Sequence, residues 1–232
     1  MWGQPPPAVR PEQIAAAEEG TIMGMYGHLR QITVTDLERL RGNPEEIEEF
    51  INGKPENAKA AEAALERVKK LVTDFQLSAK AGDPVEQERL RAKILGDLKA
   101  VGVRLPGETP EDSLSIEKSW QVIHYLLTGQ IDQAPPPLGN TILGGEEIGE
   151  ERDYGRVRFL TPVQVREVAE ALSAVSRDDL FRRFDIQSMK AAKVYPCTDH
   201  LDREWVQHYF EPLCRYYSDA AANGNAMLLW IE

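Results

Sequence analysis

The apolar run AMLLWI at residues 226–231 decides the fold, because six consecutive apolar residues suit a strand that is buried on both faces. Asn223-Gly224-Asn225 stands directly before this run and predicts the end of a helix. The apolar stripe of that helix consists of Trp205, Tyr209, Leu213, Tyr216 and Ala220, and Pro212 either kinks the helix or restarts it. These residues therefore predict a long helix that leads into a central strand.

Two more strands and several helices are predicted upstream. One strand lies within 21–33, where Gly24 and Gly27 would weaken it unless another backbone approaches closely or a bulge intervenes. The other strand includes Val157 and Leu160. Thr161 and Gln164 predict a capping box for a helix that extends to about 174. The pattern as a whole predicts one compact α+β domain.

The remaining helices are predicted from capping residues and apolar spacing. Thr35 or Asp36 starts two short helices that reach about 51, and further short helices start after Ser176 and Asp185. An amphipathic helix with Ile116, Trp120, Ile123 and Leu127 on one face ends at Gly129.

Residues 57–102 predict an antiparallel helical hairpin. The apolar residues Ala61, Leu65, Val68, Val72 and Phe75 recur at spacings of three and four, and Leu90, Ile94, Leu98 and Val101 resume the pattern after a break at 81–84. The charges between 54 and 112 cancel, although the whole chain carries a net charge of −11. The hairpin is either a packed helical layer or an arm for dimerisation and partner docking.

Composition excludes several classes of function. A net charge of −11 makes nucleic acid and membrane surfaces poor partners, since both carry negative charge. The two cysteines of the 232 residues indicate a reduced, cytoplasmic protein. Residues 1–20 contain four prolines and lack a signal-peptide core, so we expect a mobile tail.

Five segments together resemble the YfbM-like family of bacterial proteins of unknown function, which is also called domain of unknown function 1877. The segments are GMYGHLRQIT (24–33), IEKSWQVIHYLLTG (116–129), LGNTILGGEEIGEERDYGRVRFLTPVQV (138–165), FDIQSMKAAKVYP (184–196) and YYSDAAANGNAMLLWI (216–231). The resemblance implies an α+β fold with a small mixed sheet and many helices in a single domain over 21–232, no established activity and no catalytic residues to transfer. It also implies that the hairpin, at about 54–112, is an insertion.

Two constellations carry candidate chemistry. Cys197, His200, His208 and Cys214 are zinc-type ligands within 18 residues, but His208 and Cys214 point to different faces of a helix, so we expect no metal and no cofactor. The candidate ligand site combines Trp120, His124, Gly144, Gly145, Tyr154, Arg158 and Tyr195 as apolar walls with a few polar groups. A satisfied core histidine is the competing interpretation of His124.

Two functions follow from these patterns. The first is a non-enzymatic protein-binding or regulatory module, such as an inhibitor of a toxin-like partner, with dimerisation through 57–102 as a further interaction. The alternative is a sensor or enzyme with a small-molecule pocket near Trp120 and His124. No phosphate loop, nucleophile elbow or HExxH motif supports standard catalysis.

Overall fold

A computed structural model describes residues 24–52, 58–81, 83–100, 113–198 and 201–232. The predicted mobile tail at 1–20 lies outside these residues. Contacts divide the chain into two compact units, one of residues 1–47 with 111–232 and the other of residues 48–110. No described helix is long and apolar enough to cross a membrane.

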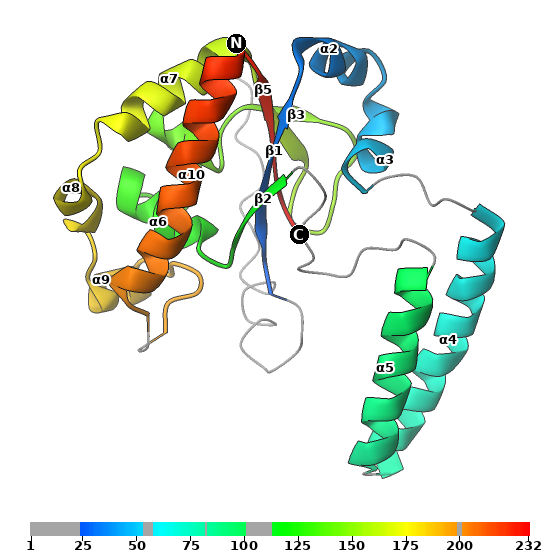
Figure 1. The fold of residues 1–232 in the computed structure, drawn as a ribbon. Coiled ribbons are helices and arrows are strands. Elements are labelled where there is room, and N and C mark those ends of the chain that lie inside the picture. Colours follow the sequence, from blue (N-terminus) through cyan, green and yellow to red (C-terminus); the bar gives the residue numbers. More distant parts are fainter. Residues whose placement is uncertain (1–23, 53–57, 82, 101–112, 199–200) are drawn as a thin grey trace. The chain divides into compact units, whose positions relative to one another are not determined.

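The first unit is built on a five-stranded sheet in the order β2-β1-β5-β4-β3 (Figure 1). The strands are β1 (Gly27–Ile32), β2 (Ser113–Glu117), β3 (Glu146–Ile148), β4 (Val157–Leu160) and β5 (Ala226–Ile231). β5 is the central strand and every one of its residues is buried, which confirms the interpretation of the run AMLLWI.

The prediction of a mixed sheet was wrong, because every described strand pair is antiparallel. A continuous apolar run is typical of parallel strands only because helices usually cover both faces of a parallel sheet. Here helices cover both faces of an antiparallel sheet. The α+β class itself is confirmed.

The two faces of the sheet carry separate cores. Met227, Leu229 and Ile231 of β5 belong to the larger core, together with residues of α6 (Trp120–Thr128), α7 (Pro162–Ser173), α8 (Arg177–Phe181), α9 (Ile186–Ala191) and α10 (Arg203–Asn223). Strand alternation directs Leu228 and Trp230 to the opposite face. There the guanidinium of Arg41, in α2 (Val34–Gly42), lies 5.4 Å from the ring centre of Phe159.

Short capping sequences set the helix boundaries. Thr161 and Gln164 form the predicted capping box of α7, and Ser176 and Asp185 cap α8 and α9 as predicted. The cap of α2 is Thr33 rather than Thr35 or Asp36. The second short helix in this region, α3 (Ile47–Asn52), follows the single turn η1 (Pro44–Glu46).

Two helix predictions need correction. Residues 113–117 form β2 instead of the first turn of α6, because Ser-Leu-Ser-Ile alternates polar and apolar residues as a strand does. In α10 the buried face consists of Val206, Phe210, Leu213, Tyr217 and Ala220. The predicted stripe was displaced by one residue at three positions, since large aromatic residues stand next to one another there. α10 continues through Pro212.

The glycines of the first strand have the predicted structural roles. The pairing of β1 with β2 shifts register between Gly27 and His28, which is a bulge. A Cβ atom at Gly27 would lie 2.7 Å from the Cβ of Trp120. Close approach of α6 therefore explains why a glycine stands in this strand.

The second unit contains α4 (Ala58–Ala81) and α5 (Pro84–Ala100), which lie side by side as the predicted hairpin (Figure 1). Val68, Ser78 and Leu90 are buried. Leu71 and Phe75 are half-buried, whereas the predicted stripe residue Val72 is 39% exposed. Whether this helical pair is an insertion relative to the family stays a prediction.

Candidate functional site

Two aromatic side chains hold the backbone that leads into β1. The indole Nε1 of Trp120 donates a hydrogen bond to the carbonyl of Met25 at 3.2 Å. The amide of Met25 donates to the hydroxyl of Tyr195, also at 3.2 Å. The two rings lie 6.3 Å apart, so α6 and the turn at 194–196 together fix the start of β1.

A lysine and a second tyrosine lie close to this point, and Tyr154 is near enough to influence Tyr195 electrostatically. The ammonium of Lys118 lies 5.8 Å from the ring centre of Tyr26. A Cβ atom at Gly24 would lie 2.8 Å from Nζ of Lys118 and 3.3 Å from the hydroxyl of Tyr195. Because Gly24 has no side chain, the side chain of Lys118 can lie there. We call Tyr26, Lys118, Tyr154 and Tyr195 the donor cluster.

The hydroxyls of the donor cluster influence one another. Burial raises the pKa of Tyr195. The amide of Met25 opposes that rise, and the neighbouring hydroxyls of Tyr26 and Tyr154 add to it. Tyr195 consequently stays protonated at neutral pH and presents an O–H donor.

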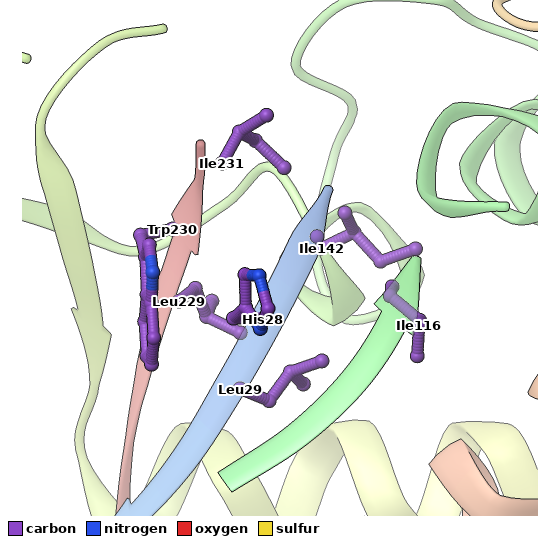
Figure 2. A pocket seen from close by; sticks show the side chains of 8 residues that line it. His28, Leu29, Ile116, Ile142, Leu229, Trp230 and Ile231 are labelled. Carbon is purple, nitrogen blue, oxygen red and sulfur yellow. The ribbon is translucent and has the colours of Figure 1, made fainter. Parts of the chain in front are cut away.

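A buried histidine lies beside the donor cluster. The ring of His28 stacks on Trp230 with a centroid distance of 5.3 Å (Figure 2). Nε2 of His28 lies 3.1 Å from the carboxylate of Glu232, although the angle is too poor for a hydrogen bond. Glu232 also contacts Arg152 at 3.5 Å and accepts from the indole of Trp230. The backbone of Glu232 pairs with that of Tyr26 and so connects this group to the donor cluster.

The hollow next to His28 does not form a ligand pocket. The side chains shown in Figure 2 leave no space between them that could hold a water molecule. The lining of the hollow is mostly aliphatic, with Leu29, Ile116 and Leu229 among the residues. We therefore assign no catalytic role to the pair of His28 and Glu232.

The structure brings together three of the seven residues predicted for the ligand site, namely Trp120, Tyr154 and Tyr195. His124 is completely buried, and its Nε2 lies 2.6 Å from the carbonyl of Asp132. Burial lowers the pKa of His124, and this effect outweighs the opposing influence of Asp132. His124 matches the competing interpretation of a core histidine.

The other predicted residues serve local structure. A Cβ at Gly144 would overlap Asn140, and Gly145 has a left-handed φ of +91°. Both glycines thus allow the tight passage from η2 (Leu138–Thr141) into β3. Arg158 pairs across the strands with Glu147 at 3.1 Å. No described contact connects these three residues with the donor cluster.

The zinc-type residues do not form a described site. In the described part of the chain, no three His, Cys, Asp or Glu side chains are grouped to hold a metal. His200 lies outside that part. His208 packs against the ring of Tyr209, and burial raises the pKa of Cys214 to about 11.

Sequence reasoning missed Tyr26, His28, Lys118 and Glu232. Two signals were present. Tyr26 and His28, two aromatic side chains with polar atoms, flank Gly27 in GMYGH. The glycines themselves indicated close approach of another chain segment. The identity of that segment depends on the tertiary fold.

Comparisons with known proteins give the same fold and no activity. The model of the domain of unknown function DUF1877 matches residues 23–230. The crystal structure of YfbM, a protein of unknown function from Escherichia coli, is 17% identical with a TM-score of 0.52, and the alignment covers 89% of this chain and 99% of YfbM. No curated protein matches. At this identity the YfbM structure supports the fold alone.

Proposed function

Because this chain belongs to the DUF1877 family, whose domain has no known function, we propose from its own features that it is a non-enzymatic protein-binding module. The pair of helices α4 and α5 is the proposed binding element. The observation that carries the proposal is the exposed apolar surface of this pair. Val72, Leu77 and Val85 are 39%, 59% and 79% exposed.

The described side chains of the two helices bury little apolar surface. In the described part of the pair, only Val68 and Leu90 are buried apolar side chains, while Leu71, Phe75 and Ile94 stay half-buried. Helical layers normally gain stability by packing a second layer against the apolar face. A partner that supplies such a layer would complete this core.

The first partner that we propose is a second copy of this chain. Residues 58–100 contain nine basic and seven acidic residues, so this segment carries +2 and the rest of the chain carries −13. Two copies repel each other through their acidic remainders, and the repulsion is least where the nearly neutral helical pairs meet. Two pairs would form a four-helix bundle with twofold symmetry.

Mass measurement by light scattering tests this proposal. We expect the full chain to have twice its monomer mass, and the double variant Leu77→Glu, Val85→Glu to be monomeric. Val163→Glu on α7 is the matched control, since Val163 is also 59% exposed but lies in the other unit. This variant should keep the dimer.

Circular dichroism of the double variant shows whether its helices remain folded. A full chain that is monomeric at all concentrations would overturn the proposed dimer. An unchanged mass after replacement of 58–100 by a short linker would overturn the assignment to the helical pair. A different protein that competes with the second copy for the pair would keep the binding function and change the partner.

A further inference from the structure

We propose that the donor cluster of Tyr26, Lys118, Tyr154 and Tyr195 binds an oxyanion, that is, the carboxylate or phosphate group of a small molecule. This proposal is independent of protein binding by the helical pair. It rests on the convergence of hydrogen-bond donors at a place where the described chain supplies no matching acceptor.

The donors come from four separate segments of the first unit. Tyr26 precedes β1, Lys118 lies between β2 and α6, Tyr154 lies in the loop before β4, and Tyr195 lies in the turn after α9. Small-molecule sites are typically assembled in this way, with a few convergent polar groups on an apolar wall. Trp120 supports this arrangement from the core, because its buried ring lies 6.3 Å from the ring of Tyr195.

Within the described residues, the ammonium of Lys118 has no counter-ion. Among the described residues, no carboxylate lies within ion-pair distance of its Nζ, and its recorded contact is the ring of Tyr26. Lys118 is only partly exposed, so its charge is less hydrated than that of a surface lysine. An anion placed here gains a charge-assisted hydrogen bond.

Glu117 precedes Lys118 in the chain and Glu232 pairs with the backbone of Tyr26, and both carboxylates have other partners. The carboxylate of Glu117 accepts a hydrogen bond from the hydroxyl of Tyr209 at 2.8 Å. Glu232 contacts Arg152 and the indole of Trp230. The hydroxyls of Tyr26 and Tyr154 have no recorded acceptor among the described residues. Three phenols and one ammonium offer donors, which selects an acceptor-only ligand.

Two donors of the cluster lie close together. Nζ of Lys118 and the hydroxyl of Tyr195 lie 2.8 and 3.3 Å from the point where a Cβ at Gly24 would stand, a place that the side chain of Lys118 itself fills. Lysine acts as a point charge toward phosphate and carboxylate, without the planar fork of arginine. The net charge of −11 opposes anions at long range, but salt screens it beyond about 8 Å at physiological ionic strength.

Backbone NMR shifts give a direct test, since the Met25 amide donates to Tyr195 and should sense an anion on that hydroxyl. Inorganic phosphate, acetate and chloride are titrated separately into the full chain near neutral pH at constant ionic strength. We expect saturable shifts of the Gly24, Met25 and Lys118 amides with phosphate or acetate and none with chloride.

Three variants locate the binding. Lys118→Gln should weaken it by about tenfold or more, which is the loss expected for one charge-assisted bond. Gly24→Ala should weaken it as well, because the added methyl displaces the lysine. Lys93→Gln, on the exposed surface of α5, is the control and should leave binding unchanged.

The outcomes separate the possible ligands. Saturation by phosphate alone or acetate alone supports the proposal and selects the anion. Shifts that do not saturate, or that saturate in Lys118→Gln at the same anion concentration as in the wild type, would overturn it. Absence of any shift would also overturn it and would indicate that solvent or the chain itself satisfies the donors.

Discussion

Replacing His124 by glutamine should remove an acid-induced loss of stability. The side chain is completely buried, and its Nε2 lies 2.6 Å from the carbonyl oxygen of Asp132. Because a carbonyl only accepts, Nε2 carries the proton and Nδ1 is unprotonated. Nδ1 is buried and has no hydrogen-bond partner in the described chain. A second proton would therefore create a buried, unpaired charge.

The direction in which stability changes with pH follows from the lowered pKa of His124 in the folded state. Burial moves this pKa below the value of 6.5 that applies to the unfolded chain. Between the two values the unfolded chain binds one proton more than the folded chain, so the free energy of unfolding decreases as pH falls below 6.5. For one proton the slope reaches at most about 1.4 kcal/mol per pH unit. The melting midpoint should then change by about 2–4 °C per kcal/mol.

Denaturant unfolding between about pH 7.5 and pH 5 measures this difference. Glutamine can donate to the same carbonyl but cannot titrate, so His124→Gln should lose less stability on acidification than the wild type. His208→Gln, on the exposed face of α10, serves as the control and should keep the wild-type slope. Parallel pH profiles for the wild type and His124→Gln would refute the reasoning.

Three further substitutions test the packing that supports the site. Tyr217→Phe should cost about 1–3 kcal/mol of unfolding free energy, because it leaves the buried carbonyl of Thr141 without its donor at 2.8 Å. Thr161→Ala should cost about 1 kcal/mol through loss of the capping box of α7. Gly145→Ala should cost about 1–3 kcal/mol or more, because an L-residue is strained at this φ. Denaturant titration measures all three.

Each of these expectations has a contrary result. A Tyr217→Phe variant as stable as Tyr209→Phe, whose hydroxyl contacts a partly exposed carboxylate, would mean that the Thr141 carbonyl finds another donor. If Thr161→Ala leaves the unfolding free energy unchanged, tertiary packing rather than the capping box fixes the start of α7. A neutral Gly145→Ala would mean that the turn relaxes without cost.

Local signals predicted most of the fold. Capping residues located α7, α8 and α9, and the uniform apolar run located β5, because these features act within a few residues of the chain. The errors arose where the spacing of apolar residues fits both a helix and a strand. Ser113–Glu117 also fits a helical stripe that continues into α6, and only pairing with β1 makes it a strand.

The candidate site was less predictable. Trp120 and Tyr195 were predicted together. Both side chains form hydrogen bonds with the backbone of Met25, and no sequence pattern marks this residue. From the sequence alone, Lys118 looks like an ordinary surface lysine. In the structure the absent side chain of Gly24 allows Lys118 to lie next to Tyr195. Arg158 and Gly144 share a chain segment with Tyr154, yet strand pairing with Glu147 directs Arg158 elsewhere.

The central position of β5 has a consequence for protein synthesis. Of all described elements β5 leaves the ribosome last, although β1 and β4 both need it as their hydrogen-bonding neighbour. Until then the sheet consists of two incomplete pairs with open edges, whereas α4 and α5 are neighbours in sequence that pack against each other and can form early. Truncated translation products would expose those edges and invite aggregation. If translation pauses before residue 226, the helical pair can therefore fold while the sheet still lacks its central strand.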